Sequence, residues 1–247
     1  MPSKVLLRDD EKLEAFTKNL IKNKAERLIS KNRLNLSSLY LIGSLSRGEG
    51  SAYFDEKKPV LLSDVDFLAI TRFPLKIFSE SDVAQVPFYK LGSLKNNYEL
   101  FDWRLSGIKI YGKEYLNKLP KKGITKQDIK NIVRSRYHMT KNMVSGLKTE
   151  YMRLSDTRKM IKFLFSLADW RLFKAAFYSP SPVEKTAKLK KIANDEPLTK
   201  FCEEGLEFLK HPETPLEFDK IKNFTLRQYF EFSKEFDDLS LPNLIEI

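Results

Sequence analysis

Cysteine is almost absent from this chain of 247 residues, since Cys202 is its single example. One thiol can neither close a disulfide within the chain nor build a cysteine-based zinc cluster. No apolar run is long enough to span a bilayer, and the apolar patch in the opening residues MPSKVLLRDDEK is too short for a signal peptide. We therefore expect a cytoplasmic protein with no membrane partner.

Positive charge is in excess, with a formal net charge of +11 at pH 7. Such an excess favours polyanionic partners, which include nucleotides, RNA, DNA and acidic surfaces. Lysine-rich surfaces can also serve solubility alone, and no zinc finger, long arginine-rich tail or RNA-binding signature accompanies the charge. The charge therefore raises nucleic acid as a candidate partner without selecting it.

The stretch from Leu39 to Gly48 predicts a phosphate-binding turn. Leu39 to Ile42 is a short apolar run of the kind that forms a buried strand. Gly43 follows where the chain must turn, and glycine tolerates backbone angles that other residues avoid. We expect Ser44 to Gly48 to open a short helix, whose free N–H groups would attract phosphate oxygens together with the Arg47 cation.

A second apolar run, Val65 to Ile70, begins beside Asp64 and Asp66. If this run is a strand, its two-residue alternation places both carboxylates on one face. Carboxylate oxygens are hard ligands that suit Mg²⁺ carrying nucleotide phosphates. Phosphate donors at one strand end and metal ligands on a neighbouring strand predict a phosphoryl- or nucleotidyl-transfer site.

This combination resembles the signature of the nucleotidyltransferase superfamily, which includes DNA polymerase beta and the minimal and aminoglycoside nucleotidyltransferases. The resemblance rests on Gly43-Ser44 and on Asp64-x-Asp66 within apolar residues, and the SRGEGS wording from Ser46 to Ser51 adds to it. One departure is the segment from Gly50 to Leu62, which is longer than in minimal members. Its charged run and its proline indicate a surface insertion.

The resemblance implies an enzyme that moves a nucleoside monophosphate from a nucleoside triphosphate to an acceptor hydroxyl and releases pyrophosphate. Asp64 and Asp66 would hold Mg²⁺, in an expected two-ion site, while Gly43 and Ser44 cradle the β- and γ-phosphates and Arg47 assists. ATP is the expected donor nucleotide. The acceptor stays open among small molecules, RNA such as a tRNA end, and a protein hydroxyl.

Members of this superfamily carry a third carboxylate on a strand beside the first two. The segment from Tyr98 to Leu105 is rich in β-forming residues and is our candidate for that strand. Asp102 is the first choice for the third catalytic and metal-binding acid, because the opposite face of the segment is the more apolar one. Glu99 is the alternative, and either acid could instead be a surface residue paired with Arg104 or a lysine.

The chain predicts an α+β architecture in two domains. Residues 1–120 would form the nucleotidyltransferase domain, a mixed β-sheet with flanking helices that includes a first helix after Asp9-Asp10 and a strand over 108–112. Residues 124–247 would form a helical bundle. Five helices are expected there, starting near Thr125, Ser155, Pro182, Leu198 and Leu216, and the second of them is apolar nearly all round and should be the buried centre.

Weaker candidates lie in the helical region. Arg134, Arg136 and His138 share one helix and could reach the nucleotide or acceptor, although a basic helix face is more often simply solvated. Lys185 could meet a triphosphate. The rival to the enzyme hypothesis is a nucleic-acid-binding module that keeps the fold without the chemistry.

Overall fold

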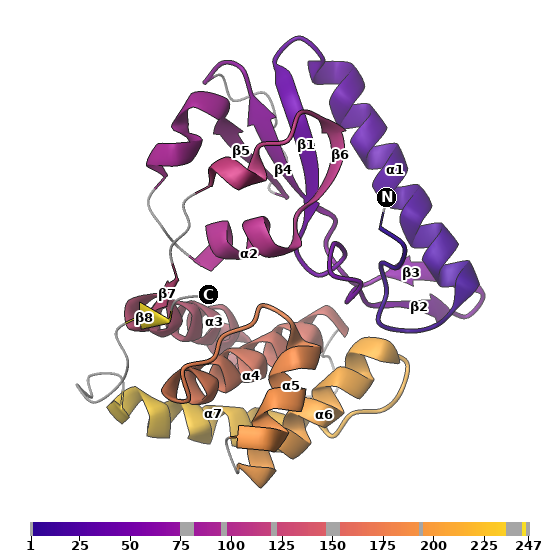
Figure 1. Ribbon diagram of the computed structural model, residues 1–247. Coiled ribbons are helices and arrows are strands. Elements are labelled where there is room, and N and C mark those ends of the chain that lie inside the picture. Colours follow the sequence, from indigo (N-terminus) through magenta and orange to yellow (C-terminus); the bar gives the residue numbers. More distant parts are fainter. Residues whose placement is uncertain are drawn as a thin grey trace. The chain divides into compact units, whose positions relative to one another are not determined.

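The computed structural model describes residues 2–74, 82–94, 98–119, 123–146, 154–192, 195–235 and 244–245. The chain divides into two compact units, Met1–Lys122 and Gly123–Ile247. The first unit combines a small mixed sheet with helices, and the second is mostly helical (Figure 1). The α+β class is therefore confirmed.

A four-stranded sheet in the order β5-β4-β1-β6 forms the centre of the first unit. Its strands are β1 (Leu36–Ile42), β4 (Asp66–Thr71), β5 (Val83–Pro87) and β6 (Ile108–Gly112). β1 pairs antiparallel with β4 and with β6, whereas β4 pairs parallel with β5. The sheet is thus mixed, and the two apolar runs expected to be strands are its buried middle.

Side chains alternate along the central strands and feed two apolar clusters. Leu39 and Phe67 belong to a cluster with α1 (Glu11–Asn32), while Tyr40 and Leu68 belong to a second cluster with residues of α2 (Tyr98–Ser106). The 3-10 helices η1 (Phe88–Ser93) and η2 (Leu116–Lys118) contribute Leu91 and Leu116 to the second cluster. The sheet therefore separates two packed layers.

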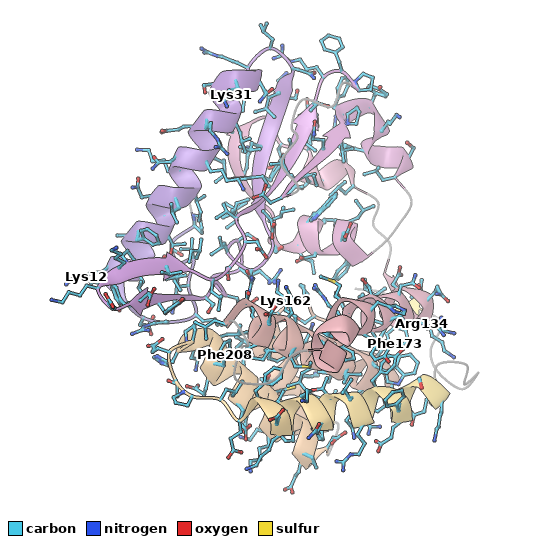
Figure 2. All side chains as sticks on the ribbon, turned by 180° about the vertical axis from the view of Figure 1, so that it is seen from behind. Lys12, Lys31, Arg134, Lys162, Phe173 and Phe208 are labelled. Atoms are coloured by element: carbon cyan, nitrogen blue, oxygen red, sulfur yellow. The ribbon has the colours of Figure 1, made fainter. Side chains whose placement is uncertain are left out.

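Helix α1 starts and ends where the sequence predicts. The Asp10 side chain accepts hydrogen bonds from the N–H groups of Lys12 and Leu13 and so caps the first turn. The buried face follows the spacing of three to four residues that an amphipathic helix requires, through Leu13, Thr17, Ile21, Ala25 and Leu28. Lys12 and Lys31 project outward near the two ends of the helix (Figure 2).

The expected surface insertion is a β-hairpin rather than an irregular loop. β2 (Ala52–Asp55) pairs antiparallel with β3 (Lys58–Leu61). The turn between them holds Glu56 at a φ of 55°, and the charged residues 55–58 are exposed. Both ends of the hairpin are fastened, because Ser51 N–H donates to Ser63 Oγ at 2.9 Å and Ser63 N–H donates to Ser51 O at 3.1 Å.

The segment expected as the strand beside β4 is instead helix α2, so this prediction is wrong. Leu100 and Trp103, three residues apart, both pack on the second apolar cluster, which is the spacing of one helix face. Aromatic residues favour strands only where a pleated surface receives them. β5 already pairs with β4 at that position, and its sequence gave no clear strand signal.

The second unit has five helices among its described residues. They are α3 (Lys126–Gly146), α4 (Leu154–Lys174), α5 (Pro182–Ile192), α6 (Glu196–Lys210) and α7 (Phe218–Glu235). A two-residue pair, β7 (Ile124–Thr125) with β8 (Leu244–Ile245), was not expected from the sequence. The five helices were expected, and their starts lie within a few residues of the predicted ones.

Helix α4 is the buried centre of this unit, as its apolar circumference predicts. It contacts α3, α5, α6 and α7, and Trp170 and Phe163 are fully buried on it. The helix also carries the buried polar residues Arg158 and Asp169. Across the described ranges of the chain, no helix combines the length and the apolarity that crossing a bilayer needs.

Gly112 offers a test of the sheet geometry. Its φ is +82°, and a Cβ there would press on the Ser37 carbonyl oxygen and stand 2.8 Å from Ser38 Oγ. We expect Gly112→Ala to lower the free energy of unfolding of the first unit by about 2–4 kcal/mol, measured by urea denaturation followed by circular dichroism.

Gly92→Ala is the matched control for this prediction. A Cβ at Gly92 meets no atom within 4 Å, and its φ lies outside the left-handed range. Its urea midpoint should equal that of the wild type or rise slightly. Equal midpoints for the two alanine variants would contradict the β1–β6 pairing described here.

Candidate functional site

The turn after β1 is compact but is not a helix. Gly43 takes a φ of +76°, and Ser46 Oγ donates to Gly43 O at 2.7 Å. Glu49 N–H closes the turn on Ser44 O at 2.9 Å, and Gly48 has a second positive φ, of 74°. The expected short helix over 44–48 is therefore wrong, and the segment is a hydrogen-bonded turn that ends at the left-handed residue Gly48. Phosphate binding here would depend on turn N–H groups and not on a helix dipole.

Asp66 stands against this turn. It is the first residue of β4, and the antiparallel register places it opposite Ile42, the last residue of β1. An ideal Cβ built on Gly43 would lie 3.1 Å from Asp66 Oδ2. The missing side chain of Gly43 therefore leaves space beside one carboxylate oxygen, at the point where the phosphate turn was predicted.

Asp64 precedes the strand and is exposed. Val65 and Phe67 both pack in the cluster on the α1 side, so the two-residue alternation extends back to Val65. That alternation places Asp66, and Asp64 with it, away from α1. The buried Ser63 anchors the approach to the strand through its bond to Ser51.

Arg47 links the turn to α2 through two ion pairs. Its Nε donates to Glu49 Oε2 and its Nη1 donates to Asp102 Oδ1, each at 2.7 Å. Burial would lower the pKa of the Arg47 guanidinium, but the charges of Asp102 and Glu49 outweigh burial and hold that pKa above its usual value. Ser106 Oγ donates to Asp102 Oδ1 at 2.8 Å and steadies the same carboxylate.

Asp102 thus reaches the turn, although from a helix and through Arg47. Glu99, the alternative acid, lies exposed in the first turn of α2. Glu49 was missed by the sequence reasoning, and the available signal was its place two residues after Arg47 in the SRGEGS stretch. Glu49 is only 8% exposed, so we assign it a structural role in holding the turn.

Asp82 was also missed, and it lies beside Asp66. Phe67 N–H donates to Asp82 O at 2.9 Å, and Phe67 pairs with Val83 in the parallel register of β4 and β5. The Asp82 carboxylate forms an ion pair with Lys24 of α1, whose Nζ also donates to Val65 O at 2.8 Å. The residue before β5 is therefore an acid at this end of the sheet, and it is bonded to α1.

The predicted three-acid set is not gathered at one point. Within the described residues, no group of three or more histidine, cysteine, aspartate or glutamate side chains is placed to share one metal ion. The turn and the strand pairing bring Gly43 and Asp66 together, and Arg47 joins Asp102 to them. Asp64 lies two residues before Asp66, on the exposed approach to β4.

In the second unit, Lys185 is held by Asp169 and does not point to solvent. Its Nζ donates to Asp169 Oδ2 at 2.8 Å, and the two side chains are 8% and 4% exposed. Burial raises the pKa of Asp169 to about 6, against the lowering effects of Lys185 and Arg136. Asp169 Oδ1 is buried without a hydrogen-bond partner. The suggested contact of Lys185 with a triphosphate therefore has no support in the geometry.

Comparison with known proteins identified no relative of this chain. No family model, no curated protein and no solved structure matches this chain. Functional assignment therefore depends on the residues at the Gly43 turn and on their chemistry.

The Asp169–Lys185 pair predicts a pH-dependent loss of stability. Lys185→Met leaves a buried carboxylate without its partner, which should lower the free energy of unfolding of the second unit by about 3 kcal/mol near pH 8. Lys185 lowers the pKa of Asp169, which is about 6 in the wild type, so its loss should raise that pKa further. As the pH falls, the variant therefore takes up this proton earlier than the wild type, and protonation removes the unpaired buried charge. The deficit should therefore shrink at about pH 5, as measured by urea denaturation at both pH values.

The double variant Asp169→Leu/Lys185→Met is the control. It removes both charges and fills similar volume with apolar atoms, so most of the stability should return at both pH values. A single-variant deficit of the same size at both pH values would show that an unpaired Asp169 charge is not its cause.

Proposed function

We propose that the first unit is a metal-dependent nucleotidyltransferase that uses a nucleoside triphosphate, with ATP as the expected donor. The observation that carries the proposal is the contact between the Gly43 turn and Asp66, which the β1–β4 register creates. A turn that suits phosphate and a carboxylate that suits a divalent cation then share one end of a sheet. This is the arrangement that the resemblance of the sequence motif implies.

The carboxylates fit a magnesium site in their chemistry. Asp64 and Asp66 provide hard oxygen ligands, and the absent Cβ of Gly43 leaves room beside Asp66 Oδ2. When bound there, Mg²⁺ would neutralise phosphate charge and orient the triphosphate. Asp82 does not complete this site, because its carboxylate pairs with Lys24 of α1, whereas Asp66 faces away from α1.

Phosphate contacts would come from the turn itself. The backbone of Gly43 and the hydroxyl of Ser44 lie at its start, and Arg47 is fixed within it by Glu49 and Asp102. A guanidinium carries five N–H donors, more than these two ion pairs require. Its cation is therefore held in place before a nucleotide arrives, which reduces the cost of ordering it on binding.

The reaction itself is a substitution at phosphorus. The acceptor oxygen forms a bond to the α-phosphorus, the bond from that phosphorus to the bridging β-oxygen breaks, and pyrophosphate leaves with that electron pair. The acceptor proton passes to a nearby carboxylate or to water. Positioning and charge neutralisation supply most of the rate in such transfers, and these are the tasks proposed for the turn and its acids.

A second candidate is a nucleic-acid-binding module without catalysis. The observation that favours it is the position of Asp102, which is engaged with Arg47 on a helix, and not presented beside Asp66 by a strand. The two candidates differ in one measurable way, since only the enzyme consumes a nucleoside triphosphate.

The decisive assay incubates the purified chain with each labelled nucleoside triphosphate, Mg²⁺ and a panel of small molecules, RNA and protein. We expect transfer of label with release of pyrophosphate. Asp66→Asn and Asp64→Asn should each lower the rate by about a hundredfold or more, since each removes a charged ligand for the ion.

Asp55→Asn is the matched control, because Asp55 is an exposed acid of the β2–β3 hairpin. Its rate should stay within about twofold of the wild type, as expected for a surface change. Transfer that survives in the Asp64→Asn/Asp66→Asn double variant would reject the assignment. A failure of every nucleotide and acceptor, with nucleic acid still bound, would favour the silent module.

Asp102 has a separate prediction, because the structure ties it to Arg47. If it positions Arg47, Asp102→Asn should raise the KM for the triphosphate about tenfold and leave kcat within about threefold. Glu49→Gln should behave in the same way, since it loosens the other ion pair of Arg47. A fall in kcat of about a hundredfold for Asp102→Asn alone would instead identify it as the general base.

A further inference from the structure

Aromatic rings from α3 and α7 meet at the surface of the second unit. Tyr137 stacks on Tyr229 with ring centroids 3.9 Å apart and planes 9° apart. Phe230 meets both rings edge-on, at centroid distances of 6.3 Å and 5.7 Å, and His138 lies 5.6 Å from Tyr137. We call Tyr137, His138, Tyr229 and Phe230 the α3–α7 aromatic surface.

One side of this surface packs on the core of the unit, and the other side is exposed to solvent. The fully buried Phe163 of α4 lies 6.0 Å from Tyr137 and 5.8 Å from Tyr229, so the stacked pair is seated on the core. Phe230 is 55% exposed, and Met139, on α3 next to His138, is 52% exposed. Large apolar side chains that are exposed beside packed aromatic rings, as Phe230 is, are typical of interaction sites.

Helix α3 adds positive charge along the same element. Lys126, Lys130 and Arg134 recur every four residues and therefore follow one side of the helix, with Arg136 nearby in sequence. The one acid of the helix, Asp128, accepts hydrogen bonds from Thr125 N–H and Oγ1 at 2.9 Å and 2.6 Å. Helix α3 therefore carries a large excess of positive charge.

Arg134 connects the positive charge of α3 with the aromatic rings, because it lies near Tyr229. Burial and Tyr137 raise the pKa of the Tyr229 hydroxyl, whereas the Arg134 cation partly lowers it. The Arg134 side chain is exposed (it is labelled in Figure 2). An exposed cation therefore lies near a half-buried aromatic stack whose exposed neighbours are His138 and Phe230.

We infer that the α3–α7 aromatic surface, with Arg134 and the lysines of α3, binds single-stranded nucleic acid. Unpaired bases stack on exposed aromatic rings whatever their sequence, and neighbouring cations hold the phosphates between them. A cationic small molecule would be repelled by α3, and a duplex keeps its bases stacked on one another. The inference does not depend on the proposed transferase, because this binding needs neither Mg²⁺ nor a nucleoside triphosphate.

The test is fluorescence anisotropy with labelled oligouridylate and oligodeoxythymidylate of about 12 nucleotides, and with a duplex of the same length, over a series of salt concentrations. We expect both single strands to bind, and the duplex to bind at least about tenfold more weakly. Phe230→Ala should weaken single-strand binding about five- to tenfold through lost base stacking. Arg134→Gln should reduce the slope of log K against log salt concentration by about 0.7, the value for one phosphate contact on a single strand.

Two variants in the first unit are matched controls. Phe73 is 58% exposed, so Phe73→Ala removes an equally exposed ring, and Lys12→Gln removes an exposed cation from α1. Affinity should stay within about twofold for Phe73→Ala, and Lys12→Gln should leave the salt slope unchanged. Because Phe230 is half exposed, its truncation should leave the thermal midpoint of the chain intact.

Four outcomes would overturn the inference. The first is no single-strand binding at about 0.1 M salt. The second is equal binding of the duplex and the single strands, and the third is equal weakening by Phe230→Ala and Phe73→Ala. Polyglutamate binding that matches the oligonucleotides would also contradict it, because a stacking surface distinguishes bases from carboxylates.

Discussion

The antiparallel pairing of β1 with β4 is the constraint on which the candidate site depends. It sets Ile42 opposite Asp66 and so brings the Gly43 turn against a carboxylate from a later part of the chain. The β2–β3 hairpin between these strands does not disturb the register, because Ser51 and Ser63 are bonded to each other at its base. The hairpin is therefore an insertion between closely held ends, where added residues cost little stability.

Much of the architecture could be predicted because its signals are local. Asp10 caps α1, apolar spacing marks α1 and α4, and short apolar runs mark β1 and β4. Helix α2 could not be predicted in this way, because its aromatic residues suit a strand or a helix and the apolar cluster on the sheet decides between them. The pairs β4–β5 and β7–β8 join segments whose own sequences hold few strand signals, so only tertiary contacts fix them.

The candidate site, too, could be predicted from the sequence only in part. Two neighbouring strands sufficed to anticipate that Asp66 would lie near Gly43, since register follows from alternation. The partners of Arg47 could not be anticipated, because Asp102 arrives on a helix that was assigned as a strand. Lys185 is a similar case. Its partner Asp169 lies on the preceding helix, 16 residues earlier, and nothing in the intervening sequence indicates that the two would be buried together.

Among the described residues, buried and exposed cations differ in what they can contribute to binding, and this bears on the effect of the net charge of +11. Arg47 and Lys185 are buried beside carboxylates, so their fields are largely cancelled nearby and salt screens them little. Arg134 is exposed, so mobile counterions surround it and a bound polyanion would release them. A buried and paired arginine suits a nucleotide that must be held in one geometry. Exposed cations beside stacked rings suit a longer polyanion that binds in many registers, and only the second kind of binding should weaken steeply as salt rises.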